Sequence, residues 1–276
     1  MSALRLGVMC ITEDQAGQIL LSQRSDLGVW NLPGGRLDVG ESLITGGLRE
    51  VKEETGIEAD FKRFLGLYYL DGWGRMNILL QAEARGGKLV DSGFETKANA
   101  YFPPTAIPDS FWGHEYLIAQ EAGNCHIIRS EASALRRVKW QLRKRWVLNL
   151  LKGHREPAFP QFDINAQTLV RDANMNFYGG GETVEFELPV IKVDGQSAPW
   201  VQVQEVLKAR IPGLQERAVW VGCEQDLKEN RFIFSFVFQS LEVLPEAYPP
   251  DYFKGTSTEI LIKAFMKSEI YFHVKE

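Results

Sequence analysis

The chain has 276 residues, of which 45% are hydrophobic and 24% charged, and its formal net charge is -5 at pH 7. These values are typical of an ordered globular protein long enough for two domains with separate cores, and they exclude a long disordered region. The acidic balance argues against general nucleic-acid binding, because affinity for a phosphate backbone comes from an excess of Lys and Arg.

Cysteine usage and apolar runs predict the compartment. The three cysteines, Cys10, Cys125 and Cys223, are an odd number at wide spacing, which fits neither a disulfide framework nor a zinc site. We therefore expect free thiols in a reducing environment. The first apolar run, residues 6–11, predicts a strand and not a signal peptide, and no run approaches the length of a membrane span. Together these features predict a cytoplasmic protein with no membrane partner.

Hydrophobic periodicity predicts the elements of the first half in chain order. The predicted strands cover residues 4–12, 18–23, 60–70, 75–83 and 98–102. A helix is predicted over residues 42–55, between the second and third strands, and Gly56 is typical of a position just past a helix end. This order predicts an α+β fold in which a mixed sheet lies between helices.

The middle of the chain is basic. Residues 131–152 carry many Arg and Lys side chains, with Leu135, Val138, Leu142 and Trp146 at helical spacing. This pattern favours an amphipathic connecting helix, within residues 129–154, that has a solvated basic face. A nucleic-acid-binding helix is the sharper alternative.

The second half, residues 155–276, repeats the coarse order of the first. Strands are predicted over residues 162–170, 183–193, 217–223 and 231–243, with a helix over residues 200–210. We expect a second α+β domain that is a degenerate copy of the first. An unrelated α+β domain is the alternative.

One constellation carries the chemistry. Gly35 is followed after five residues by Glu41, and after seven more by the run Arg49 to Ile57. Within this run Glu50, Glu53 and Glu54 stand at i, i+3 and i+4, so their carboxylates project from one face of the helix. Like charges at this spacing repel unless a cation lies between them. Hard oxygen ligands of this kind suit Mg²⁺ or Mn²⁺.

Residues 35–57 resemble the signature of the Nudix hydrolase family, Gly-x5-Glu-x7-Arg-Glu-U-x-Glu-Glu-x-Gly-U, in which U is a bulky aliphatic residue. Every fixed position is matched, with Val51 and Ile57 at the U positions. We call residues 35–57 the box. The resemblance extends over residues 1–128, where it implies a catalytic Nudix domain, although only the box is highly specific.

The resemblance implies hydrolysis of a phosphoanhydride bond in a nucleotide-type small molecule. Nucleotide sugars, ADP-ribose, dinucleoside polyphosphates and oxidised nucleoside triphosphates all remain open as substrates. A module that senses a nucleotide metabolite on the same fold is the rival function. The intact glutamate set favours the enzyme.

The resemblance also implies roles for individual residues. Glu50, Glu53 and Glu54 are the expected metal ligands, and Glu53 or Glu50 is the expected base that takes a proton from the attacking water. The backbone carbonyl of Gly35 is a further expected ligand, because two successive glycines let the backbone approach a cation.

Three other side chains are candidates near the site. For Arg49 the resemblance implies a structural ion pair with Glu41, and a phosphate contact is the alternative. Arg24 faces either solvent or the phosphate cleft, which strand parity does not decide. Gly46 and Gly47 lie inside a helix at a cost of about 1 kcal/mol each relative to Ala. Either another backbone packs closely there, which we expect, or the helix is locally soft.

The second half lacks such a set. Aligned by pattern, its predicted helix has Glu205 at the position of Glu50, but Lys208 and Ala209 at those of Glu53 and Glu54. We therefore expect one metal site per chain, and a second half that packs, forms a homodimer or shapes the substrate pocket.

Overall fold

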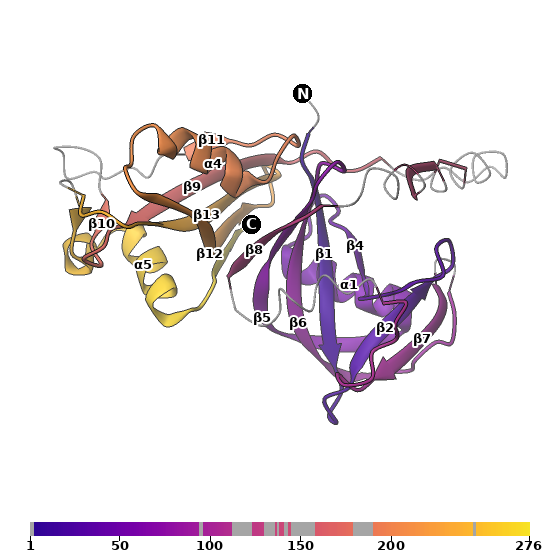
Figure 1. Ribbon diagram of the computed structural model, residues 1–276. Coiled ribbons are helices and arrows are strands. Elements are labelled where there is room, and N and C mark those ends of the chain that lie inside the picture. The colour runs from indigo at the N-terminus through magenta and orange to yellow at the C-terminus, as the bar shows by residue number, and fades with distance from the viewer. Residues whose placement is uncertain are drawn as a thin grey trace.

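The computed structural model describes residues 3–93, 96–111, 123–129, 136, 138–140, 143–144, 158–178, 190–244 and 247–276. We call residues 3–129 the first half and residues 158–276 the second half. The described strands join into one sheet that runs through both halves (Figure 1). The fold is α+β, with helices beside a mixed sheet, as the sequence predicts.

The first half follows the predicted order of elements. Its strands are β1 (Arg5–Glu13), β2 (Ile19–Arg24), β3 (Trp30–Asn31), β4 (Gly34–Arg36), β5 (Ile57–Leu70), β6 (Arg75–Gly87), β7 (Thr96–Phe102) and β8 (Asn124–Ile128), and its described helix is α1 (Leu43–Thr55). The prediction lacks β3, β4 and β8, because strands this short carry too little periodicity to be recognised.

The second half contains more elements than the sequence predicts. Its strands are β9 (Asp163–Arg171), β10 (Phe177–Tyr178), β11 (Val190–Lys192), β12 (Leu214–Asp226), β13 (Arg231–Ser240), β14 (Ala247–Tyr248) and β15 (Tyr271–Lys275). Its helices are α4 (Pro199–Lys208), the 3-10 helix η1 (Pro250–Phe253) and α5 (Ser257–Lys267). The prediction lacks everything from β14 onward. Of the strand predicted over residues 183–193, β11 is the described part, and residues 179–189 lie outside the described chain.

The strand pairings of the first half recur in the second. β1 pairs in parallel with β6 from Arg5 and Arg75 onward, and β9 pairs in parallel with β13 from Asp163 and Arg231 onward. β4 is antiparallel to β1 as β11 is to β9, and β5 is antiparallel to β6 as β12 is to β13. β8 is parallel to β5 as β15 is to β12, and β2 is antiparallel to β7 as β10 is to β14.

A common irregularity fixes which residues correspond. The register of β5 against β6 shifts between Phe64 and Gly66, and that of β12 against β13 shifts between Trp220 and Gly222. The same two glycines begin the parallel pairings with β8 and β15. Gly66 and Gly222 therefore occupy equivalent places, and other equivalent residues can be counted from them.

The same residue spacing relates the two main helices, α1 and α4. The equivalent pairs are Leu43 with Pro199, Gly47 with Val203, Val51 with Leu207 and Thr55 with Ile211, and every one of these residues is buried. Both helices thus turn the same face toward the sheet.

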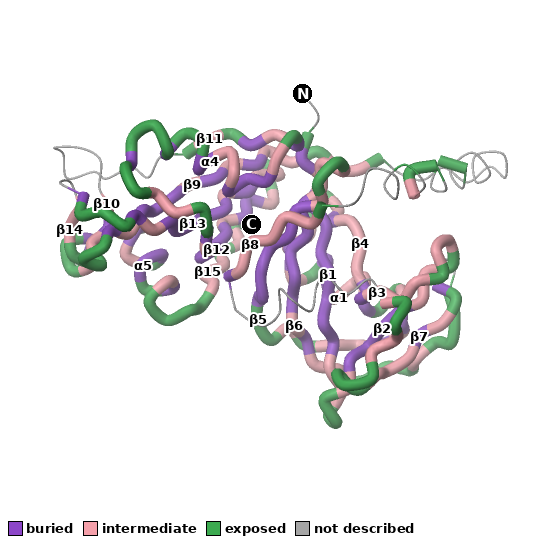
Figure 2. The backbone as a smooth tube through the Cα atoms, in the orientation of Figure 1, coloured by how far each residue is buried: buried purple, intermediate pink, exposed green. Residues whose placement is uncertain are grey.

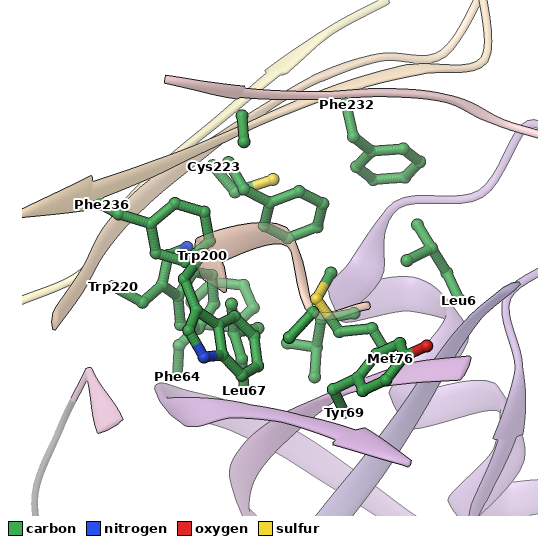
Figure 3. Close-up of a cluster of buried hydrophobic side chains, with 14 of the residues drawn as sticks. Leu6, Phe64, Leu67, Tyr69, Met76, Trp200, Trp220, Cys223, Phe232 and Phe236 are labelled. Carbon is green, nitrogen blue, oxygen red and sulfur yellow. The ribbon is translucent and has the colours of Figure 1, made fainter. Parts of the chain in front are cut away.

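The interior consists of three apolar clusters. One lies within the first half around Met9 and Leu79, and one within the second half around Phe177 and Val237. The largest contains residues of both halves, and Figure 3 shows them gathered in one place. The central strands of both halves are buried along most of their length (Figure 2). Each half therefore contains a smaller cluster of its own, and the two halves also share a core that the sequence does not predict.

Three further sequence predictions concern the basic segment, the cysteines and membrane spans. The basic segment 131–152 lies outside the described residues except at 136, 138–140 and 143–144, which are helical. All three cysteines are free thiols, and burial raises the pKa of Cys10 to about 11. None of the described helices is long and apolar enough to span a membrane.

Candidate active site

Two glycines bring the backbone of β4 between β1 and the helix. Gly34 has a φ of 155°, and a Cβ at this residue would lie 2.7 Å from the Cα of Met9. A Cβ at Gly35 would lie 2.6 Å from the carboxyl carbon of Glu50. A side chain at Gly34 would therefore collide with the backbone of β1, whereas a side chain at Gly35 would displace the Glu50 carboxylate, which lies directly against the backbone of the box.

Local interactions set the ends of α1. The Ser42 hydroxyl accepts a hydrogen bond from the Thr45 N–H at 3.1 Å, and the Thr45 hydroxyl accepts one from the Ser42 N–H at 2.8 Å. This reciprocal pair satisfies donors that a helix start leaves open. Gly56 ends the helix in the left-handed conformation, with a φ of 77°.

Arg49 is the centre of an ion-pair network. It donates from Nε and Nη2 to the two carboxylate oxygens of Glu41, at 2.9 and 2.8 Å. Its Nη1 donates to Glu50 at 3.0 Å and to Glu53 at 2.9 Å. The hydrogen bond to Glu41 is the main cause that raises the pKa of Arg49. The structure thus contains the expected ion pair with Glu41 and links it to two candidate metal ligands.

The three candidate ligands differ in environment. Glu50 has a side chain that is 14% exposed, whereas that of Glu53 is 60% exposed. Glu54 accepts a hydrogen bond from the Gly34 N–H at 3.2 Å. Among the described residues, no three acidic, His or Cys side chains are gathered closely enough to hold a metal ion.

The donor set nevertheless fits a hard divalent cation. Three carboxylates on one helix face repel one another, and here Arg49 and the Gly34 N–H offset part of that charge. All candidate donors are oxygens, which Mg²⁺ and Mn²⁺ prefer. The Glu50 carboxylate also fills the space that a side chain at Gly35 would take, so it lies directly beside that residue.

Arg75, at the start of β6, is a neighbour that the sequence analysis missed. It donates to the Gly35 carbonyl at 3.1 Å and to the Asn77 side chain at 2.8 Å. Burial is the main cause that lowers its pKa, and the positive charges of Arg5 and Arg24 lower it further, whereas the nearby Tyr68 and Glu50 act in the opposite direction. A guanidinium with this environment favours an anion beside it.

Arg5 and Arg24 are close enough to Arg75 for their charges to affect its pKa. The guanidinium carbons of Arg5 and Arg75 lie 5.0 and 5.6 Å from the ring centre of Phe159. Arg24 forms a salt bridge with Asp26 at 2.8 Å and is close enough to Arg75 to affect its pKa. Arg5 lies beside Arg75 because β1 and β6 pair in parallel. The sequence signal that could have revealed this pair is the arginine at the start of each of these two strands.

The helix glycines pack against side chains and not against another backbone, so that expectation is wrong. A Cβ at Gly46 would lie 2.8 Å from Leu37 Cδ1 and 2.9 Å from Glu41 Oε1, and a Cβ at Gly47 would collide with Leu80. Small residues at these positions therefore leave room for Glu41 and for the sheet core.

The second half has no equivalent carboxylates. Counted from the paired glycines, Val206, Ala209 and Arg210 correspond to Glu50, Glu53 and Glu54. The predicted alignment through Glu205, Lys208 and Ala209 is wrong by one residue, because it ignored the strand register and the buried helix face. The strand pairing also sets Ile191 where the first half has Gly35.

A separate cavity of about 510 Å³ lies between the halves. It is lined by residues of both halves, including Arg5, Tyr69, Trp73, Phe159 and Gly195, but by no residue of the box.

Comparison with known proteins supports the resemblance of the box. A family model described as NUDIX domain matches residues 3–120. A Bacillus subtilis (strain 168) protein named "Putative 8-oxo-dGTP diphosphatase" is 34% identical over 102 residues, which is 37% of this chain and 68% of that protein. An ADP-ribose pyrophosphatase of Methanocaldococcus jannaschii is 31% identical over 112 residues, which is 38% of this chain and 66% of that protein.

Other relatives are matched over a smaller share. A human 8-oxo-dGDP phosphatase is 31% identical over 116 residues, but this chain spans only 35% of its length. The crystal structure of a NUDIX hydrolase from Nitrosomonas europaea covers 47% of this chain and 81% of its own, with 23% sequence identity and a TM-score of 0.42.

Proposed function

This chain belongs to the Nudix hydrolase family, and we propose that it uses water and a divalent cation to cleave a phosphoanhydride bond in a nucleoside diphosphate linked to another group. One observation carries the proposal most directly. The Glu50 carboxylate lies against Gly35, while Arg75 binds the carbonyl of the same glycine. This arrangement supports the proposal, because a carboxylate that would bind a cation and a guanidinium that would bind a phosphate lie at one backbone position.

Glu50, Glu53, Glu54 and the Gly35 carbonyl would hold Mg²⁺ or Mn²⁺ in this proposal. When bound, the ion would offset the charge of the phosphates and activate water. A carbonyl oxygen has two lone pairs, so Gly35 can accept the Arg75 hydrogen bond and still face a cation. Arg49 would hold the carboxylates of Glu50 and Glu53 in place through its hydrogen bonds to them.

Glu53 is the better placed of the two candidate bases. Its side chain is mostly exposed and can reach a water, whereas Glu50 is packed against the box. The water oxygen forms the new bond to phosphorus as the bridging oxygen leaves with the other phosphate. Glu53 accepts the proton that the water gives up.

Arg75, with Arg5 and Arg24 nearby, would bind the phosphate that is not attacked. The relatives are named for 8-oxo-dGTP, 8-oxo-dGDP and ADP-ribose, which share a nucleoside and a diphosphate but little else. We therefore propose that the site recognises the nucleoside and the diphosphate, and we leave open which group is linked to the diphosphate.

A nucleotide panel tests the proposal. The purified full chain is incubated with Mg²⁺ and ADP-ribose, nucleotide sugars, dinucleoside polyphosphates and oxidised nucleoside triphosphates, and phosphate release is measured after phosphatase treatment. We expect hydrolysis of at least one compound, with a nucleoside monophosphate among the products. If the chain bound a compound of the panel but hydrolysed none of them, the result would instead support the sensing module.

A further inference from the structure

The two halves make a reciprocal contact that the repeated strand pairings reveal. Tyr69 of β5 pairs with Met76, and Gln225 of β12 pairs with Phe232, at the equivalent place in the register. The Tyr69 hydroxyl donates to the Gly195 carbonyl at 2.9 Å, in the loop before α4. The Gln225 side chain donates to the Glu41 carbonyl at 2.8 Å, in the loop before α1. Each half thus holds the loop before the main helix of the other.

The contact made by Gln225 consists of two hydrogen bonds and involves the box. Its side-chain oxygen also accepts a hydrogen bond from the N–H of Leu43, the first residue of α1, at 3.2 Å. A helix leaves its first N–H groups without internal partners, so Gln225 completes the cap that Ser42 and Thr45 begin. Gln225 is buried, which protects both bonds from water.

We infer that the second half is a duplicate of the first that has lost its carboxylates and now positions the box of the first half through Gln225. The route consists of direct contacts. Gln225 holds the backbone of Glu41, the Glu41 carboxylate holds Arg49, and Arg49 holds Glu50 and Glu53. Gln225 touches neither ion nor substrate in this account and is a positioning residue.

The amide of Gln225 is suited to this task because it both donates and accepts. Gln225→Met keeps the approximate length and the apolar stem of the side chain but replaces the polar amide, and so removes both hydrogen bonds. Tyr69→Phe is the matched control, because it removes the equivalent hydrogen bond to Gly195. That bond holds a loop of the second half, which has no counterpart of the metal-binding carboxylates. Both substitutions should weaken the junction between the halves, but only Gln225→Met should change the structure of the box.

Two measurements on the full chain separate these effects. Hydrogen exchange of residues 38–46 should become at least several-fold faster in Gln225→Met and stay unchanged in Tyr69→Phe. The affinity for Mn²⁺, measured by calorimetry without substrate, should fall about tenfold in Gln225→Met only, as is common when a group that orients metal ligands is lost. Gln225→Glu keeps the acceptor for Leu43 and should show an intermediate exchange rate.

The metal part of this inference rests on the proposed function, and the two can fail separately. If wild type and Gln225→Met bound Mn²⁺ equally well, with equal exchange of residues 38–46, the positioning role would be overturned while the proposed function stood. If wild type bound no Mn²⁺, the proposed metal site and its dependence on Gln225 would both be overturned. Equal effects of Gln225→Met and Tyr69→Phe on exchange and affinity would show that both residues only join the halves.

Discussion

Gly35 has no side chain because the Glu50 carboxylate occupies the space beside it. Gly35→Ala should therefore lower hydrolysis at least tenfold, since the new methyl group would lie 2.6 Å from the carboxyl carbon of Glu50 and displace it. The backbone need not change, so the circular dichroism spectrum should remain that of wild type. Steady-state rates in saturating Mg²⁺ check this, and an unchanged rate would place the reacting centre away from Gly35.

Glu54 contributes charge more than packing. Glu54→Gln keeps an oxygen that can accept the Gly34 N–H but removes a negative charge from the helix face. Loss of hydrolysis should exceed about a hundredfold, in the range seen when one electrostatic group is removed from an active site. Glu58→Gln is the control, because Glu58 is an exposed carboxylate paired with Lys52 just beyond the helix. Near wild-type turnover of Glu54→Gln would contradict the assignment of this helix as the metal site.

Arg75 should act on substrate binding. Arg75→Met keeps the apolar stem but removes the guanidinium, so kcat/KM should fall about tenfold or more, the usual range for a lost hydrogen bond to a charged group. Arg63→Met, which removes an exposed arginine of β5, should have little effect. Equal changes in the two variants would argue against a phosphate contact at Arg75.

At this scale the sequence predicts what is close along the chain. Glu41 and Arg49 could be paired from spacing, and that ion pair is present in the structure. Arg75 and Gln225 could not be found, because their partners Gly35 and Glu41 lie far away in sequence. Only strand pairing and the junction of the halves bring them together.

Helices α1 and α4 show how an element can be predicted while its register is missed. Both helices were recognisable from periodicity, and Gly56 marks the end of α1 correctly. The correspondence between them was set one residue wrong, because short sequence similarity around Glu205 outweighed burial. The buried face, which runs through Val51 and Leu207, settles the count.

The corrected correspondence predicts that the second half cannot easily regain a site. Val206→Glu, Ala209→Glu and Arg210→Glu, combined in a chain that also carries Glu54→Gln, should not restore hydrolysis. The reason is that β11 has Ile191 where β4 has Gly35, so no bare backbone faces the new carboxylates. Recovery of turnover in this variant would show that carboxylates alone suffice.

The described strands of both halves form one sheet, and the two halves repeat the same strand pairings. Composition and length predicted two units, and the structure adds a core shared between them around Phe64 and Trp220, whose rings lie 5.6 Å apart. That junction depends on β8, which pairs with both β5 and β12. A five-residue strand gives almost no periodic signal, so the junction was beyond the reach of sequence patterns.

Metal dependence tests the central claim most directly. The full chain is treated with EDTA, the chelator is removed, and hydrolysis of the best substrate of the nucleotide panel is measured before and after a divalent cation is added. We predict no turnover in metal-stripped buffer and recovery with Mg²⁺ or Mn²⁺, without any need for Zn²⁺, because the site offers carboxylate and carbonyl oxygens. Full turnover in metal-stripped buffer would contradict it.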